Sequence, residues 1–485
     1  MAAVAQGEQA KYYPCPFIHL PKSVQMDNAS PEKNLVQWTQ LLEQHEEQKL
    51  LTLLCDAPII EVAEFLTLQP TQKLVKLLTL LPQELQGAVF ADFEEEQQHV
   101  LLQLLCKKDF AGIFTHIPSH QRAEFYQKLR DNEQIQLLPY LPKKVREDVM
   151  TLSAYPPDTA GGIMSTDFAT VIENMTVKQA IQKLREDSPS KKMIYYIYVV
   201  DVNMQMIGFV SLKDLIMAAP DKKVASVIHE NFVYAEVTDD RESVAQQVEK
   251  YDLVAIPILN EEKQLVGIVR YDDAMDVIRA EETEDMEKFM GIVSNEETSD
   301  YLKASSLQHF HKRVIWIVGL FIASIISEII IHQHEALLGR LTVLALYLPM
   351  IAGAGGNAGS QAATVVIRAI SLGQITLRDW LGVLLKETRI AFLLAFCLFF
   401  LAFLKVMILS GNVVLEHNSP YILAFTIALS LSLQVIISTV IGAALPLVSK
   451  YFNGDPAVAA SPAITTLVDI TGMAIYFAIA VALLC

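Results

Sequence analysis

Cysteine is scarce in this sequence, and its few residues are scattered. The chain of 485 residues has five cysteines, Cys15, Cys55, Cys106, Cys397 and Cys485, without any C-x-x-C pair. This usage indicates neither a disulfide framework nor a zinc site and is typical of small buried apolar side chains. The first residues, MAAVAQGEQAKYYPCP, also lack a basic start followed by an apolar core, so they predict no secretory signal.

Charge is nearly missing from the second half of the chain. Residues 301–485 hold 7 of the 55 acidic and 10 of the 38 basic residues, which leaves a net charge of −20 on residues 1–300 and +3 on the rest. The acidic first half argues against a nucleic-acid partner, since phosphates attract the opposite sign, and favours cations as ligands. No nucleophile–base set or phosphate-binding loop is present either, so we expect no enzymatic activity.

Five apolar segments follow residue 312, and each is long enough to cross a bilayer, which takes about 20 helical residues. The predicted spans are 314–333, 341–369, 388–410, 420–447 and 457–483. Positive loop residues collect on one side, at Lys312, Arg313, Arg368, Arg378, Lys386, Arg389 and Lys450. By the positive-inside rule, this pattern predicts a cell-membrane protein with its first 300 residues in the cytoplasm and its C-terminus outside.

The second span has an unusual composition, PMIAGAGGNAGSQAAT over residues 349–364. So many glycines indicate either a break in the helix or a very close helix contact. The polar residues around them are more than packing alone requires, and a backbone that leaves the helical path at membrane depth is tolerated where it lines a cavity. We therefore expect Gly356 and Asn357 to line a pore.

The fifth span carries Asp469 in the stretch PAITTLVDITGMAIYF. A carboxylate at the centre of a membrane helix costs roughly 2.5 kcal/mol or more on insertion scales. Thr465 and Thr466 share its helical face, and Pro462 one turn earlier is expected to free the Val458 carbonyl. An all-oxygen lining of this kind suits hard cations such as Mg²⁺.

Two other interpretations of Asp469 stay open at this point. It is a buried carboxylate capped by neighbouring hydroxyls, or it relays protons. As a metal site, one carboxylate per chain is weak, but a two-fold homodimer would supply a pair. Because Mg²⁺ gives up its waters reluctantly, such a pair would hold the hydrated ion through its waters.

Residues 168–280 contain an internal duplication. MIGFVSLKDLIMA (206–218) aligns with LVGIVRYDDAMDV (265–277), and each copy predicts strand, helix, strand, strand, helix. The pair resembles tandem CBS domains, a regulatory α/β module that often binds adenosine nucleotides such as ATP. The resemblance assigns Asp214 of the first copy to the nucleotide ribose and makes Ser211, in the same motif, a further nucleotide-binding residue. The second copy has Arg270 in place of the hydroxyl residue, and the alternative is a pair that serves only as a dimer scaffold.

The other cytoplasmic segments are acidic. Residues up to about 155 are leucine-rich, and recurring prolines at Pro82, Pro118 and Pro142 predict stacked short helices in a superhelical layer. After the duplication, AEETEDMEKFMG (280–291) predicts an acidic helix that leads to the first span.

The order of these parts resembles the MgtE family of magnesium channels. The motifs that carry the resemblance are YPPDTAGGIM (155–164), EETEDMEKFMG (281–291), PMIAGAGGNAGSQAATVVIRA (349–369) and DPAVAASPAITTLVDITG (455–472). The family implies homodimeric Mg²⁺ conduction, closed by Mg²⁺ bound to the cytosolic domains. It assigns Asp469 and the Thr465 carbonyl to the pore ion. It assigns Glu281, Glu284 and Asp285 to regulatory Mg²⁺, whereas Ser461 replaces the asparagine of some members.

The sequence thus predicts a multidomain homodimer with an all-α N domain, an α/β CBS pair and an all-α five-helix membrane domain. The expected divisions are a tail at 1–34, the helical domain at 35–155, the CBS pair at 156–280, the connecting helix at 281–312 and the pore domain at 313–485. The predicted function is Mg²⁺ uptake. The alternatives are an ion-coupled transporter of Mg²⁺, Mn²⁺ or Co²⁺ and a non-conducting nucleotide sensor in the membrane.

Overall fold

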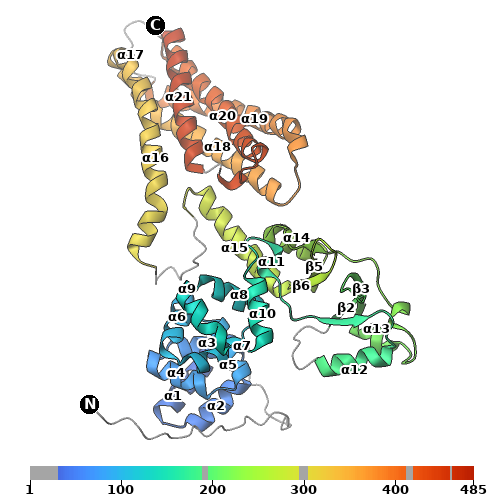
Figure 1. Cartoon of the computed structure of the whole chain (residues 1–485). Coiled ribbons are helices and arrows are strands. Elements are labelled where there is room, and N and C mark those ends of the chain that lie inside the picture. The colour runs from blue at the N-terminus through green and yellow to red at the C-terminus, as the bar shows by residue number, and fades with distance from the viewer. Residues whose placement is uncertain (1–30, 188–194, 294–303, 411–418, 459–460, 485) are drawn as a thin grey trace. The chain divides into compact units, whose positions relative to one another are not determined.

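The computed structural model describes residues 31–187, 195–293, 304–410, 419–458 and 461–484 (Figure 1). The predicted tail therefore lies almost wholly outside the described residues, as does part of the predicted connecting helix. The chain divides into two compact units, residues 1–279 and 280–485.

The first unit begins with a layer of short helices. Its members are α1 (Pro31–Glu43), α2 (Glu47–Asp56), α3 (Ile59–Thr67), α4 (Thr71–Leu80), α5 (Gln83–Ala91), α6 (Glu95–Leu104), α7 (Lys107–Thr115), α8 (Ser119–Lys128), α9 (Asp131–Leu137), η1 (Leu138–Tyr140) and α10 (Lys143–Leu152). Pro82, Pro118 and Pro142 each stand directly before a helix, as their recurrence predicts. Phe90, Phe110 and other apolar side chains fill one continuous core between these helices.

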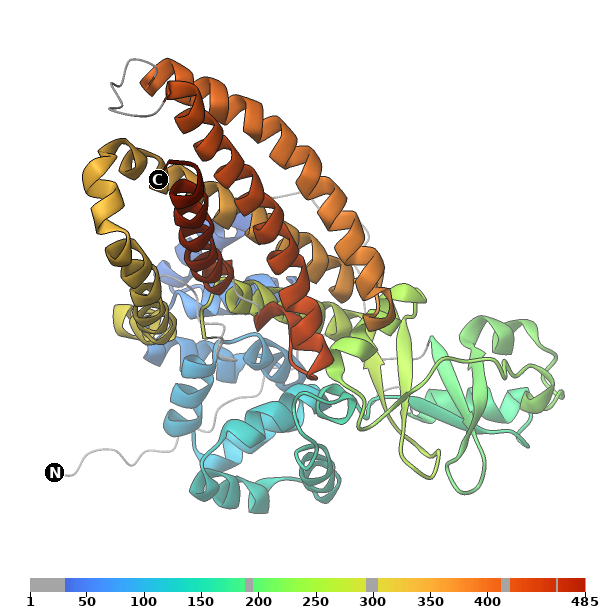
Figure 2. The ribbon, with the colours of Figure 1, turned by 90° about the horizontal axis from the view of Figure 1, so that it is seen from above.

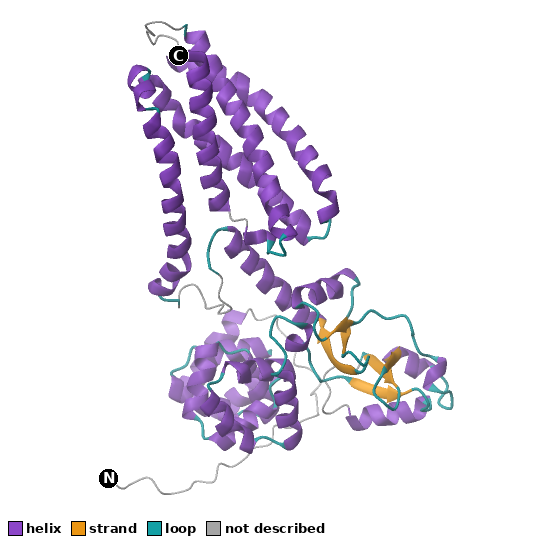
Figure 3. Cartoon of the chain, turned by 45° about the horizontal axis from the view of Figure 1, so that its top comes forward, coloured by secondary structure: helices purple, strands orange, loops and turns teal. Residues whose placement is uncertain are grey.

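The duplication folds into two similar halves, whose strands are orange in Figure 3. After α11 (Ala160–Ile163), the first copy runs β1 (Ala169–Ile172), α12 (Val177–Asp187), β2 (Tyr196–Val200), β3 (Met206–Ser211), α13 (Leu212–Met217) and η3 (Val224–Ser226). The second runs β4 (Ala235–Glu236), α14 (Arg241–Lys250), β5 (Ala255–Leu259), β6 (Leu265–Arg270) and α15 (Tyr271–Phe289). The predicted order of strands and helices is confirmed in both copies.

Each copy builds a three-stranded sheet with the same pairing. In the first sheet β2 is central, parallel to β1 and antiparallel to β3, and β5 has the same place in the second. Strands β3 and β6 begin at Met206 and Leu265, two residues that the sequence alignment pairs. Each central strand is almost fully buried because helices and the neighbouring copy cover it.

The second unit is a bundle of long helices. It contains α16 (Ser306–Gln333), α17 (Glu335–Arg340), η4 (Thr342–Tyr347), α18 (Leu348–Ser371), η5 (Leu377–Asp379), α19 (Trp380–Ser410), α20 (Pro420–Tyr451), η6 (Pro456–Val458) and α21 (Ser461–Leu484). Helix α20 packs against α18, α19 and α21, and α16 packs along α21 (Figures 1 and 2). The buried residues of α20 include several small or polar ones, so the bundle core is not purely apolar.

Four described helices are long and apolar enough to cross a membrane, against the five predicted spans. They are Ser306–Gln333, Leu377–Leu409, Pro420–Tyr451 and Ser461–Leu484. The predicted second span is α18, which has 24 residues but is rich in glycine and polar side chains. Its composition, rather than its length, separates it from the other four.

Helix α18 is continuous, so of the two interpretations of its glycines the close contact is the one that the structure shows. A Cβ atom on Gly442 of α20 would lie 2.1 Å from the carbonyl oxygen of Gly359. A Cβ on Gly356 would lie 3.1 Å from Cγ2 of Thr465. The glycines let three helix backbones approach more closely than any side chain would allow.

The expectation for Pro462 was wrong in one respect. Helix α21 begins at Ser461, so Pro462 lies in its first turn, where an N–H has no helical partner in any case. Val458 belongs to the separate turn η6. The proline therefore starts the helix and does not release the Val458 carbonyl from it.

Candidate ion path and cytosolic sites

The contact between α18 and α21 brings together several residues that the sequence predicts for the pore. Ser461 Oγ lies 2.9 Å from Ser360 Oγ, which ties the start of α21 to the middle of α18. One turn further along α21, Thr465 contacts Gly356. Asn357 lies on an exposed side of α18.

Asp469 is half-buried on α21, and its Oδ1 atom is enclosed without a hydrogen-bond partner among the described residues. The nearby hydroxyls do not cap it. Thr465 Oγ1 donates to the Ser461 carbonyl and Thr466 Oγ1 donates to the Pro462 carbonyl, each at 3.0 Å. The interpretation of Asp469 as a carboxylate capped by its neighbouring hydroxyls is therefore not what the structure shows.

The two threonines keep oxygen lone pairs available beside the carboxylate. A hydroxyl that donates its proton to its own helix still accepts from, or coordinates, another group. Thr465, Thr466 and Asp469 are all half-buried, as expected for side chains at the edge of a path rather than in a core. Together they offer an uncompensated carboxylate and two hydroxyl oxygens.

Further along α21, the same face is buried against the neighbouring helices. Gly472, Met473 and Tyr476 are buried, and the Tyr476 hydroxyl donates to the Leu344 carbonyl at 2.9 Å. This upper part joins the apolar core of the bundle. The polar lining is thus confined to the half of α21 between Ser461 and Asp469.

Sequence reasoning missed Gln434 of α20, which is fully buried beside this face. Its Nε2 atom donates to the Val468 carbonyl at 2.7 Å. The signal that would have found it is an amide in an otherwise apolar span, because a polar side chain in a membrane helix usually binds a neighbouring helix.

The acidic end of α15 has a basic residue at its centre. Lys288 Nζ lies 2.8 Å from Oε1 of Glu284 and 2.8 Å from Oδ2 of Asp455, which follows α20. Partial burial, together with the nearby charge of Asp455, raises the pKa of Asp285 to about 6. Phe289, at the end of α15, packs against Ala363, Ile464 and Val468 in the same unit.

Of the three predicted regulatory ligands, Glu284 and Asp285 therefore lie at a contact with the 455–458 turn. Within the described residues, no group of three or more His, Cys, Asp or Glu side chains is arranged to hold a metal ion. The acidic side chains are close enough to repel each other, as the raised pKa of Asp285 shows, and Lys288 offsets part of that repulsion.

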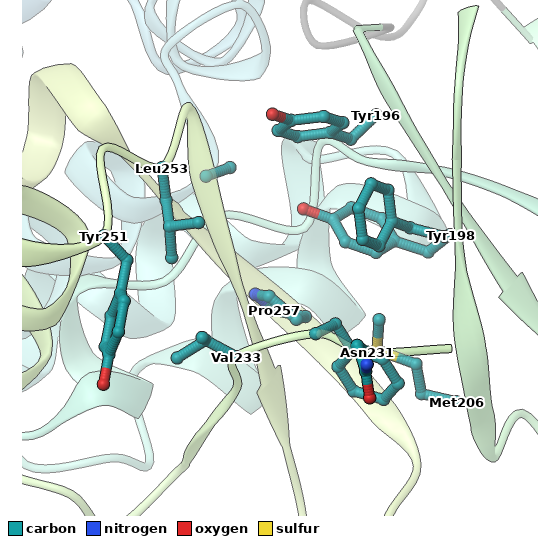
Figure 4. Close-up of a pocket in the computed structure, with 11 residues that line it drawn as sticks. Tyr196, Tyr198, Met206, Asn231, Val233, Tyr251, Leu253 and Pro257 are labelled. Carbon is teal, nitrogen blue, oxygen red and sulfur yellow. The ribbon is translucent and has the colours of Figure 1, made fainter. Parts of the chain in front are cut away.

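A cavity of about 420 Å³ lies between the two copies of the duplication (Figure 4). Its lining is mainly aromatic and apolar: Tyr196, Tyr198, Met206, Phe209, Asn231, Phe232, Val233, Tyr251, Leu253, Ala255 and Pro257. In Figure 4 the rings of Tyr196 and Tyr198 lie on one side of the space, and Tyr251 lies on the opposite side. A flat aromatic ligand fits this chemistry.

Ser211 and Asp214 lie beside this cavity rather than in its lining. Asp214 accepts from the Ser211 hydroxyl at 2.6 Å and pairs with His229 Nε2 at 3.0 Å, and His229 stacks on the cavity residue Phe209. The Ser211 hydroxyl bond, followed by the His229 bond, lowers the pKa of Asp214, so the group is a carboxylate at neutral pH.

The corresponding aspartate of the second copy is engaged differently. Asp273 accepts two hydrogen bonds from Arg270, at 2.8 and 3.0 Å, and lies 3.3 Å from His120 Nε2 of α8. The replacement of the hydroxyl residue by Arg270 therefore gives Asp273 a structural role at the contact between α8 and the second copy.

Family models match three parts of the chain. Residues 348–479 match the family model described as a divalent cation transporter, residues 57–158 match the MgtE intracellular N domain, and residues 160–221 and 224–280 match the CBS domain.

Curated relatives match over most of their length. The magnesium transporter MgtE of Thermus thermophilus is 34% identical over 426 residues, which cover 82% of this chain and 92% of that protein. The magnesium transporter MgtE of Bacillus subtilis is 31% identical, with 81% and 85% covered. Among solved structures, the cytosolic domain of the Mg²⁺ channel MgtE in complex with ATP is 30% identical, covers 50% of this chain and 99% of that one, and has a TM-score of 0.48.

The protein is thus a divalent cation transporter of the membrane, with a helical N domain and a CBS pair. It belongs to the MgtE family of magnesium transporters. The resemblance drawn from the sequence motifs is confirmed, as is magnesium transport as the function.

Proposed function

We propose that Mg²⁺ crosses the membrane along the face of α21 that carries Asp469, and that Mg²⁺ at the acidic end of α15 closes this path. The observation that carries the proposal is the half-buried carboxylate of Asp469, whose Oδ1 has no hydrogen-bond partner among the described residues and which lies one turn after two threonine hydroxyls. A chain keeps a carboxylate at membrane depth when a cation or a partner offsets its charge. Transport of Mg²⁺ supplies that cation.

A homodimer completes the site. One chain contributes a single carboxylate, and Mg²⁺ holds its inner waters tightly. Two copies related by a two-fold axis would place a pair of Asp469 carboxylates around one hydrated ion. Thr465 and Thr466, with the exposed Asn357 of α18, would contact the waters of that ion, whereas Gly356 is buried in the helix contact and would not.

Five spans then cross the membrane in each chain. With 24 residues, α18 is about 36 Å long at 1.5 Å per residue, which is enough to span the hydrocarbon core. Its polar composition is tolerated because it faces α20, α21 and the ion path rather than lipid. The excess of Lys and Arg on one side orients the first 300 residues to the cytoplasm and the C-terminus to the outside.

Regulation follows from electrostatics. Glu281, Glu284 and Asp285 repel one another and Asp455, and bound Mg²⁺ would relieve this repulsion and hold α15 against the 455–458 turn. An ion shifts such an equilibrium only by binding one state more tightly than the other, typically by about 1–3 kcal/mol for one pair of sites. Several such ions acting together produce a steep response.

The cavity between the two copies is proposed as a site for ATP or another adenosine nucleotide. Its aromatic side chains would stack on the base. Asp214, adjacent through His229 and Phe209, supplies the carboxylate that the family motif assigns to the ribose.

The test is Mg²⁺ flux into proteoliposomes that contain the native chain or Asp469→Asn, at low internal Mg²⁺. We expect flux in the native chain and its loss in the variant, with the dimer intact by size-exclusion chromatography. Glu335→Gln is the matched control, since that carboxylate is 77% exposed in the same unit. Equal flux in both would remove Asp469 from the ion path.

Two further outcomes identify the alternative functions. Flux that depends on a pH gradient would make Asp469 a proton carrier in an ion-coupled transporter. Absence of flux in the native chain would favour the non-conducting nucleotide sensor.

A further inference from the structure

The amide of Gln434 is enclosed by three helices at the level of the pore carboxylate. Its side chain is fully buried, Nε2 donates to the Val468 carbonyl at 2.7 Å, and Oε1 has no partner among the described residues. Burial of an amide is unfavourable unless the group is hydrogen-bonded, and here one of its two polar atoms is not. Leucine or methionine would fill the same space without leaving a polar atom unpaired, so packing alone does not explain the amide.

Two glycines make room for this amide. A Cβ on Gly355 of α18 or on Gly472 of α21 would lie 2.7 Å from Nε2 of Gln434. Gly472 follows Val468 by four residues, so its N–H is the helical donor to the same carbonyl. Because Gly472 has no side chain, the amide of α20 reaches an oxygen that a side chain would otherwise cover.

The bond acts on the peptide group that carries Asp469. The Val468 carbonyl and the Asp469 nitrogen belong to one planar peptide unit, so a contact that fixes the carbonyl also fixes the backbone from which the carboxylate projects. Since the amide lies between Gly355 and Gly472, it sets both the rotation and the height of α21 against α18.

We propose that Gln434 is a positioning residue for ion selectivity, which holds the Asp469 carboxylate at the spacing that suits Mg²⁺. This inference rests on the proposed role of Asp469. The water shell of Mg²⁺ is a near-ideal octahedron that the ion gives up reluctantly, so the carboxylates that hold it must stand at one spacing, whereas Ca²⁺ accepts six to eight oxygens in flexible arrangements. A pair of carboxylates on loosely held helices would therefore admit Ca²⁺ more readily.

The experiment compares the native chain with the variant Gln434→Met, whose side chain has a similar length but no amide. Proteoliposome influx of Mg²⁺ and of Ca²⁺ is measured separately, at several concentrations. We expect Gln434→Met to assemble as a dimer and conduct Mg²⁺, with a Ca²⁺/Mg²⁺ flux ratio at least about threefold higher. An unchanged ratio would make Gln434 a packing residue and overturn the proposal.

A second pair of variants tests the same contact without altering Gln434. Gly355→Ala places a methyl group against the amide, whereas Gly353→Ala, on the same helix, meets nothing within 4 Å. The ratio should rise in Gly355→Ala only. Equal ratios in the two, or loss of assembly in both Gln434→Met and Gly355→Ala, would assign the amide to packing or folding and overturn the positioning role.

Failure of the proposed function would give results that differ from failure of the role proposed for Gln434. If the native chain conducts nothing, or if Asp469→Asn conducts normally, the ion path itself is misplaced. If the native chain conducts and Asp469→Asn does not, the Ca²⁺/Mg²⁺ ratio of the variants decides the role of Gln434 alone.

Discussion

The ammonium group of Lys288 lies 2.8 Å from a carboxylate oxygen of Asp455, although 167 residues separate the two in sequence. The same ammonium contacts Glu284 one turn back on α15. Burial alone would lower the pKa of Lys288, but its hydrogen bonds to Asp455 and Glu284 and the charges of these two residues outweigh burial and raise it, so the side chain is fully charged. It holds the end of α15 to the 455–458 turn as a fixed cation among carboxylates.

Replacement of Lys288 by methionine should therefore raise the internal Mg²⁺ concentration at which the ion path closes. Without the ammonium, Glu284, Asp285 and Asp455 are less compensated, and closure should require more internal Mg²⁺. A partly exposed ion pair such as that of Lys288 with Asp455 contributes on the order of 1 kcal/mol. A free-energy change of that size corresponds to a shift of about fivefold in the Mg²⁺ concentration at which half of the channels are closed. Flux measured against internal Mg²⁺ gives this concentration, and Lys288→Arg is the control. An unshifted curve would show that the contact does not contribute to closure.

Neutralisation of the acidic cluster tests the regulatory ligands directly. The triple variant Glu281→Gln, Glu284→Gln, Asp285→Asn should conduct at internal Mg²⁺ concentrations that close the native chain, because the ion loses its ligands. The exposed carboxylate change Asp276→Asn on the same helix is the control, with a side chain 77% exposed. Closure of the triple variant at the native Mg²⁺ concentration would exclude these residues as the regulatory site.

Nucleotide binding depends on the aromatic wall of the cavity. Tyr196→Ala should weaken ATP binding by roughly tenfold, since stacking of a base on an aromatic ring is worth about 1–3 kcal/mol. Asp214→Ala should weaken it independently if the carboxylate binds the ribose. Isothermal titration of the full chain with ATP gives both values, and Tyr140→Ala, an exposed tyrosine of the helical layer, is the control. Unchanged affinity in both variants would place any nucleotide elsewhere.

The helical period and the free-energy cost of a carboxylate in a membrane helix were sufficient to predict which residues share the face of α21 that carries Asp469. A carboxylate and two hydroxyls three and four residues away must share one side of a helix, whatever surrounds it. The strand order of the two copies was predictable for the same kind of reason, since their apolar runs alternate with the period of a strand.

Contacts between helices were not predictable in this way. The approach of Gly442 to Gly359 and the bond from Gln434 to Val468 depend on which helices are neighbours, and no local pattern contains that information. The error at Pro462 has a related cause. Hydropathy continues through residues 457–460, so the apolar run did not mark the point at which α21 begins.

His120 should make stability depend on pH. Burial lowers the pKa of His120, an effect that the nearby Asp273, Glu124 and Asp272 offset only in part and that Arg270 reinforces. A histidine with a lowered pKa contributes stability above its unfolded value of about 6.5 and loses it as the pH falls further.

The melting temperature of the detergent-solubilised chain should thus decrease between pH 7 and pH 5, and His120→Gln should decrease less. His332→Gln, with a side chain 84% exposed, should follow the native curve. Equal slopes in the native chain and His120→Gln would mean that the buried imidazole does not carry the pH dependence.

The close approach of α20 to α18 at Gly442 gives the last prediction. A methyl group on Gly442 would lie 2.1 Å from the Gly359 carbonyl oxygen, well inside contact distance, so Gly442→Ala must push α20 away from α18. Forced separation of packed elements typically costs about 1–3 kcal/mol, and more where backbone meets backbone. Gly382→Ala on α19 meets nothing within 4 Å and is the matched control. We expect a lower melting temperature in detergent, and loss of Mg²⁺ flux, for Gly442→Ala alone. If the two variants have the same melting temperature, α18 and α20 have enough freedom to separate. The positions of Gly356 and Gln434 against α21 would then be set by something other than this contact.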